Sequence, residues 1–107
     1  MGTKMTISVI MANHCAATHL DMAVLSVLAQ TAADLELIVV DDASTDDNLS
    51  AISGCRDPRI RVVARDVNRG FCASLNEGIR LARAEVVAFI ASDDLASPRY
   101  VERVLAA

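Results

Sequence analysis

The chain has 107 residues, 53% of them hydrophobic, and a formal net charge of −4. This length fits one small domain or part of one, and the apolar fraction is ample for a core. The ten lysines and arginines form no basic run, which argues against nucleic acid as a partner. No apolar run approaches the roughly 20 residues of a membrane span, and no signal peptide is apparent. Three widely spaced cysteines without a CxxC pair indicate reduced thiols in a cytosolic setting rather than a disulfide framework or a zinc site.

Apolar periodicity alternates between strand and helix along the chain. It predicts strands at residues 6–11, 35–40, 60–64 and 86–90, and helices at residues 19–29, about 49–54, 71–83 and from 97 onward. Thr18 and Ser97 are the predicted N-caps, with Pro98 as the first residue of the last helix. We expect residues 1–5 to be an expression remnant or a disordered start, and residues 6–107 to form the domain.

This alternation predicts an α/β fold with a doubly wound, mainly parallel sheet of about four strands and helices on both faces. The chain should wind outward from the first strand to the third and then return, which places the fourth strand on the other side of the first. The third strand is the least apolar and is expected nearer an edge. In the helix at 71–83, the predicted inward face comprises Leu75, Gly78, Ile79 and Ala82.

Two pairs of aspartates follow strands that the sequence predicts to be buried on both faces. Asp41 and Asp42 come after residues 35–40, and Asp93 and Asp94 come after residues 86–90. Open α/β sheets bind ligands at this carboxyl edge. Such carboxylates can hold a divalent cation, accept hydrogen bonds from a ribose hydroxyl or a base N–H, or act as general bases. Their structural alternative is helix capping, which we predict for Asp46 and Asp47.

Three common nucleotide and phosphate sites are disfavoured. A dinucleotide-binding Rossmann site needs G-x-G-x-x-G after the first strand, and residues 11–16 contain no glycine. A P-loop is absent as well. A phosphoacceptor receiver domain would carry an acidic pair after the first strand, where this chain has none.

Six short segments, taken together and in order, resemble the N-terminal half of family 2 glycosyltransferases. They are residues 9–13 (VIMAN), 26–31 (SVLAQT), 36–46 (ELIVVDDASTD), 68–70 (NRG), 75–78 (LNEG) and 91–94 (ASDD). The resemblance implies a GT-A fold and a nucleotide-diphosphate sugar as the donor, with uridine diphosphate as the default nucleotide. It covers essentially the whole chain.

The resemblance also implies roles for individual residues. The implied nucleotide-binding residues are Ala12, Asn13, His14, Asp41, Asp42 and Gly70. Asp42, with Asp41, would bond to the base or ribose, and Gly70 would allow close backbone approach. His14 stands where the family often has tyrosine and could stack on the base, or it could be a plain loop residue. Arg69 could meet a phosphate or remain solvated.

A metal site is implied at Asp93 and Asp94, which look like the end of the family's D-x-D element. Such an element would hold Mn²⁺ or Mg²⁺ between the two donor phosphates. The chain departs from the strict pattern, because Ala91 and Ser92 stand where the first acid would be.

Family members are typically much longer, and their second half supplies the acceptor site and the catalytic base. The resemblance therefore implies the donor half of an inverting transferase, inactive alone, whose acceptor is a glycan or another hydroxyl compound. We assign no catalytic residue. Membrane association could come through the missing half, whose removal would expose apolar surface and favour self-association into a homo-oligomer. The alternative is a non-catalytic nucleotide-binding or self-associating module.

Overall fold

The computed structural model describes residues 5–15, 19–32, 34–44, 57–92 and 95–106. Its strands are β1 (Ile7–Asn13), β2 (Leu35–Asp42), β3 (Ile60–Arg65) and β4 (Val87–Phe89), and its helices are α1 (Leu20–Leu28), α3 (Phe71–Leu81) and α4 (Tyr100–Ala106). The predicted helix at about 49–54 lies outside the described residues, as do Asp46 and Asp47. None of the described helices is long and apolar enough to cross a membrane.

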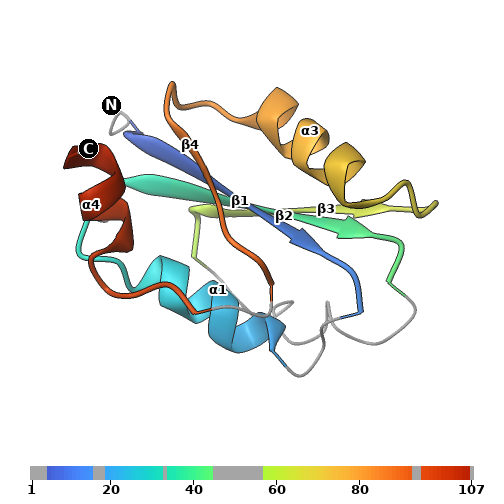
Figure 1. The fold of residues 1–107 in the computed structure, drawn as a ribbon, viewed down its shortest axis with the longest axis horizontal. Coiled ribbons are helices and arrows are strands. Elements are labelled where there is room, and N and C mark those ends of the chain that lie inside the picture. The colour runs from blue at the N-terminus through green and yellow to red at the C-terminus, as the bar shows by residue number, and fades with distance from the viewer. Residues whose placement is uncertain (1–4, 16–18, 33, 45–56, 93–94, 107) are drawn as a thin grey trace.

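The four strands form one parallel sheet in the order β3-β2-β1-β4 (Figure 1). This confirms the predicted fold class and winding. β3 is half exposed along its length and lies at one edge, as predicted. The strand predicted at residues 86–90 is not buried on both faces: β4 forms the other edge of the sheet, Phe89 is 46% exposed, and Val86 just before β4 is 39% exposed.

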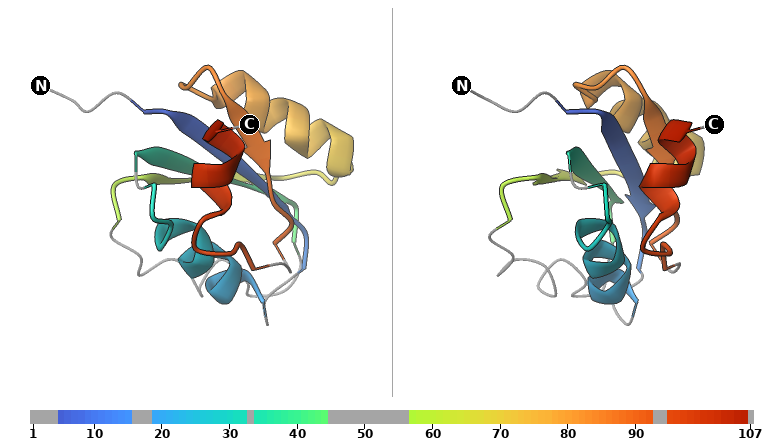
Figure 2. Two further views of the ribbon diagram at one scale, coloured as in Figure 1. Left: turned by 60° about the vertical axis from the view of Figure 1, so that its left-hand side comes forward. Right: turned by 90° about the vertical axis from the view of Figure 1, so that its left-hand side faces the viewer.

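Helices cover both faces of the sheet, with α1 and α3 on opposite sides (Figures 1 and 2). Successive strand residues point to opposite faces. One set of apolar strand residues packs with α1 and with Val101 of α4 in the main core; this set is Ile7, Val9 and Met11 of β1 with Leu35, Leu37 and Val39 of β2. The strand residues that alternate with these therefore face α3; they include Ser8, Ile10, Glu36 and Ile38.

Helix α3 lies very close to β1. Its buried residues are Ser74 and Gly78, and a Cβ added at Gly78 would overlap the side chain of Ile10. The predicted inward face is thus wrong at Ile79, which is 47% exposed. Helix α3 contacts the sheet through the small residues Ser74 and Gly78, because a larger side chain at position 78 would keep the helix farther from the sheet.

Three helices begin or end at residues other than those predicted. His19, not Thr18, is the N-cap of α1, and its side chain makes no cap hydrogen bond. α3 ends at Leu81, two residues before the predicted end, because Arg83 N donates to Glu36 Oε2 at 2.7 Å. α4 begins at Tyr100 rather than at residue 97, because the Ser97 carbonyl accepts a hydrogen bond from Gln30 Nε2 at 2.7 Å.

Candidate functional site

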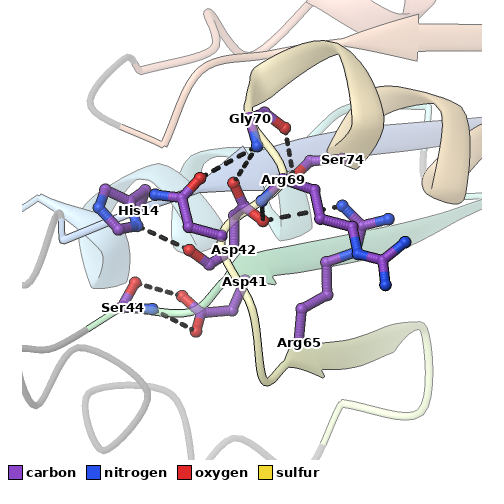
Figure 3. Close-up of polar contacts among 9 residues, drawn as sticks. His14, Asp41, Asp42, Ser44, Arg65, Arg69, Gly70 and Ser74 are labelled. Atoms are coloured by element: carbon purple, nitrogen blue, oxygen red, sulfur yellow. Dashed lines mark hydrogen bonds and ion pairs between the residues drawn. The ribbon is translucent and has the colours of Figure 1, made fainter.

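The two aspartates that end β2 point to opposite faces of the sheet, because side chains alternate along a strand. Asp41 shares its face with the α1 side of the core. Its Oδ1 accepts hydrogen bonds from Asn13 Nδ2 at 2.8 Å and from Ser44 Oγ at 2.5 Å, and its Oδ2 accepts from Ser44 N at 3.3 Å. Asp41 thus holds both the end of β1 and the turn after β2 in place. Figure 3 shows its contacts with Ser44.

Asp42 shares its face with α3 and lies at that helix's N-terminus. Its Oδ1 accepts a hydrogen bond from Arg69 N at 2.9 Å, and its Oδ2 accepts one from Gly70 N at 2.8 Å (Figure 3). Gly70 is the N-cap of α3 and has φ +93°, a conformation that favours glycine. The N-terminus of a helix favours an anion, and Asp42 supplies it here.

The side chain of Asp42 is buried yet ionised. Burial raises the pKa of its carboxyl, but the hydrogen bonds from Arg69 N and Gly70 N, with the charges of Arg65 and His14, outweigh this effect and leave the pKa below its ordinary value. An ionised carboxylate is an acceptor only. Asp42 can therefore receive N–H or O–H groups of a ligand and donates none.

His14 contacts the same residue through the main chain. Its Nδ1 lies 2.7 Å from the Asp42 carbonyl oxygen. A carbonyl can only accept, so Nδ1 carries the proton of this hydrogen bond. The Cys15 thiol lies 3.7 Å from the other ring nitrogen. The ring is exposed and fixed in orientation, which suits stacking against a flat ligand.

A pocket of about 200 Å³ opens beside Asp42 at the carboxyl edge of the sheet. Eight residues line it: Ala12, Asn13, His14, Asp42, Asn68, Gly70, Phe71 and Ser74. Five of these are predicted nucleotide-binding residues, which the fold brings together from β1, β2 and the start of α3. Asp41 does not line the pocket.

The sequence-based site list missed Asn68, Phe71 and Ser74. A signal for them existed, because Phe71 and Ser74 lie one and four residues after Gly70 and so share the face of the first helical turn. Asn68 was part of the recognised NRG segment, and its Oδ1 accepts a hydrogen bond from Gly70 N at 3.0 Å.

The acids of the described residues do not gather into a metal-binding cluster. No group of three or more histidine, cysteine, aspartate or glutamate residues could hold one within the described ranges, which omit 93 and 94. The predicted metal ligands, Asp93 and Asp94, lie outside the described residues.

The fold and the pocket together define a doubly wound α/β domain with a ligand site at the carboxyl edge of its sheet. The sequence profile of glycosyl transferase family 2 matches residues 8–107, and the chain belongs to that family. This confirms the resemblance predicted from the six segments.

Characterised and uncharacterised relatives agree with this assignment. The chain is 38% identical over 104 residues to an uncharacterised glycosyltransferase of Nostoc sp., covering 94% of this chain and 32% of the relative. It is 36% identical over 99 residues to the succinoglycan biosynthesis protein ExoO of Rhizobium meliloti, covering 92% of this chain and 28% of ExoO. It is 32% identical over 88 residues to WfaP of Escherichia coli, a UDP-Glc-dependent β-1,3-glucosyltransferase, covering 82% and 35%. The chain thus spans about a third of the length of these relatives.

Solved structures extend the similarity to the fold. Residues 1–349 of TarS from S. aureus, in complex with UDP-GlcNAc, superpose with a TM-score of 0.87 at 26% identity, over 95% of this chain and 30% of that TarS fragment. The mannosyltransferase PcManGT from Pyrobaculum calidifontis, in complex with GDP-Man and Mn²⁺, superposes with a TM-score of 0.80 at 26% identity, over 91% and 30%. The chain therefore has the predicted GT-A fold.

Proposed function

We propose that this chain is the donor-binding part of a glycosyltransferase and that the pocket beside Asp42 binds the nucleotide of a nucleotide-diphosphate sugar. The observation that carries the proposal is the ionised Asp42 carboxylate, buried at the pocket and held at the N-terminus of α3. The similar structures that hold UDP-GlcNAc and GDP-Man support the ligand class. UDP is the nucleotide we favour.

In this proposal Asp42 accepts a hydrogen bond from the base or the ribose. Each carboxylate oxygen has two acceptor sites, so the two main-chain N–H groups leave capacity for a ligand. His14 and the 63% exposed Phe71 provide flat apolar surface for stacking on the base. Nothing lies within 4 Å of the position that a Cβ on Gly70 would take, so a ligand can approach the backbone there.

The remaining predicted nucleotide residues have supporting roles. Ala12 and Asn13 form the β1 side of the pocket. Asp41 fixes Asn13 through their 2.8 Å hydrogen bond, so we assign Asp41 to positioning rather than to contact with the nucleotide.

We further propose that Asp93 and Asp94 bind Mn²⁺ or Mg²⁺. The Mn²⁺ complex of PcManGT supports this, as does the preference of both cations for carboxylate oxygens. When bound, the cation would offset negative charge on the diphosphate. Titration of Mn²⁺ against the chain, followed by electron paramagnetic resonance, should show bound ion that Asp93→Ala and Asp94→Ala each reduce.

The reaction itself is proposed for a protein that includes an acceptor part. Residues 6–107 would form the donor domain of an inverting transferase that delivers sugar to a hydroxyl acceptor such as a glycan. No described residue is assigned as the catalytic base, and the chain spans only about a third of its relatives.

Calorimetric titration of the chain with UDP, with and without Mn²⁺, tests donor binding. We expect saturable binding that is tighter with Mn²⁺ and much weaker in Asp42→Asn. Asp34→Asn is the matched control, because it changes an exposed aspartate just before β2, at the other end of the strand. Absence of UDP and GDP binding in both conditions would contradict the proposal.

A further inference from the structure

Arg65, the last residue of β3, lies next to Asp42, the last residue of β2. The two residues are register partners on neighbouring parallel strands, so their side chains share a face of the sheet. Arg65 Nη1 lies 3.7 Å from Asp42 Oδ1, and the side chains are 18% and 6% exposed respectively (Figure 3). Arg65 is not among the residues that line the nucleotide pocket.

The contact is an ion pair without a hydrogen bond. A separation of 3.7 Å exceeds hydrogen-bonding distance. Within the described part of the chain, the buried Arg65 Nη1 has no hydrogen-bond partner. Its guanidinium therefore acts on Asp42 mainly through its charge, and at close range, because little solvent separates or screens the pair.

The other groups that face Asp42 supply less charge. From β1, the His14 ring meets the main-chain carbonyl of Asp42 rather than its carboxylate. From the segment before α3, Arg69 and Gly70 contribute main-chain N–H groups. From β2 itself, the side chain of Asp41 points to the opposite face of the sheet and does not face Asp42. A buried carboxylate needs a compensating charge, and Arg65 is placed to provide it.

We propose that Arg65 is a positioning residue of the nucleotide pocket, acting through Asp42 by holding its carboxylate in place against the start of α3. This inference rests on the proposed function, because it assigns a role in binding the nucleotide. Nothing in the family match or in the pocket lining assigns Arg65. The low pKa of the Asp42 carboxyl, to which the Arg65 charge contributes, is consistent with it.

A double-mutant cycle tests the inference, with the Kd of UDP measured by calorimetry on the full chain. We expect Arg65→Gln to raise the Kd roughly tenfold, within the range found for directly interacting residues. In an Asp42→Asn background the same change should have no further effect, because Arg65 would have no carboxylate to act on. Arg99→Gln is the matched control: Arg99 is an exposed arginine that pairs with Glu102 of α4, and its loss should leave the Kd unchanged.

Arg65→Lys separates charge from folding. It keeps a cation near Asp42, so we expect a Kd within about threefold of the wild type, since the contact is a simple ion pair rather than a bidentate one. If Arg65→Gln does not fold, the lysine variant carries the test, and a folded lysine variant that binds as weakly as Asp42→Asn would overturn the proposal.

The outcomes separate the two proposals. Suppose that the wild-type chain binds UDP. If Arg65→Gln then leaves the Kd unchanged, or if its effect on the Kd simply adds to that of Asp42→Asn, the role of Arg65 is overturned and the proposed function stands. Absence of both UDP and GDP binding by the wild-type chain overturns the proposed function and this role with it.

Discussion

Two buried acids lie on the same face of β2 and meet opposite ends of α3. Glu36 and Asp42 are six residues apart, which corresponds to about 20 Å of extended strand, close to the roughly 16 Å length of an 11-residue helix. Each acid accepts main-chain hydrogen bonds near its end of the helix, and each has an arginine of β3 beside it.

Glu36 and Asp42 differ in whether a ligand can reach them. Glu36 accepts hydrogen bonds from Ser8 Oγ at 2.6 Å, Arg83 N at 2.7 Å and Arg61 Nη1 at 3.4 Å, and it does not line the pocket. Arg61 also donates to the Leu81 carbonyl at 3.0 Å, which offsets the unfavourable placement of an anion near a helix C-terminus. A buried acid with an arginine partner is therefore no functional site by itself; Asp42 becomes a candidate because it also lines a pocket.

Removing Glu36, the acid near the C-terminal end of α3, should mainly affect the stability of the fold. Glu36→Ala leaves Ser8 Oγ and Arg83 N without their acceptor and Arg61 without its ion-pair partner, so we expect the free energy of unfolding to fall by about 3 kcal/mol, as for a broken buried ion pair. Urea denaturation measures this change. The Kd of UDP for the folded protein should stay within twofold of the wild type, and a tenfold loss would contradict the separation of the two ends.

Removing the charge at the pocket end should mainly affect binding. Asp42→Asn keeps the shape but loses a charged acceptor, so we expect the Kd of UDP to rise about thirtyfold, or about 2 kcal/mol. The free energy of unfolding should fall by only about 1 kcal/mol, because the asparagine oxygen still accepts one main-chain N–H. A variant that lost stability but bound UDP normally would make Asp42 a structural acid like Glu36.

A substitution in the helix that joins the two ends should disturb both. Gly78→Ala introduces a methyl group that overlaps Ile10, and such overpacking typically costs about 2 kcal/mol. Because α3 carries Gly70 and Ser74 of the pocket, its displacement should also weaken UDP binding several-fold. Asn76→Ala, an exposed change in the same helix, is the control and should alter stability by less than about 0.5 kcal/mol.

The acid dependence of stability should report on Glu36. Burial raises its pKa, but the hydrogen bonds from Ser8, Arg83 N and Arg61 and the Arg61 charge bring the pKa below the ordinary value of 4.5. Ionised Glu36 therefore contributes its full stability above about that pH, and the contribution is lost as the pH falls through the lower folded-state pKa. Urea midpoints measured from pH 7 to pH 3 should fall less steeply in Glu36→Gln, and identical slopes would contradict this role.

The sheet could be predicted from the sequence because its signals are local. Strand–helix alternation and the buried run before Asp41 and Asp42 determine a parallel sheet and its carboxyl edge. The helix ends could not be predicted in the same way. The end of α3 depends on Glu36 and Arg61, and the start of α4 depends on Gln30, all of them distant in sequence.

The candidate site was also predictable only in part. Asp42, His14 and Gly70 follow recognisable segments, and the fold brings them to one pocket. Only Asp42 lines the pocket, because side chains alternate along a strand and Asp41 points to the opposite face of the sheet. The two aspartates are adjacent in the sequence and were predicted as one pair. Arg65 belongs to no motif, and its importance emerges only from the register that pairs it with Asp42.

The most direct test of the account is an ¹H–¹⁵N correlation spectrum of the labelled chain, titrated with UDP. We predict saturable shifts of the His14, Arg69, Gly70 and Ser74 amides around the Asp42 pocket, with little change at Ser8, Glu36 and Ala84 at the other end of α3. Shifts centred on the Glu36 end, or no saturable shift in either region, would contradict the claim that the Asp42 end of β2 is the nucleotide site.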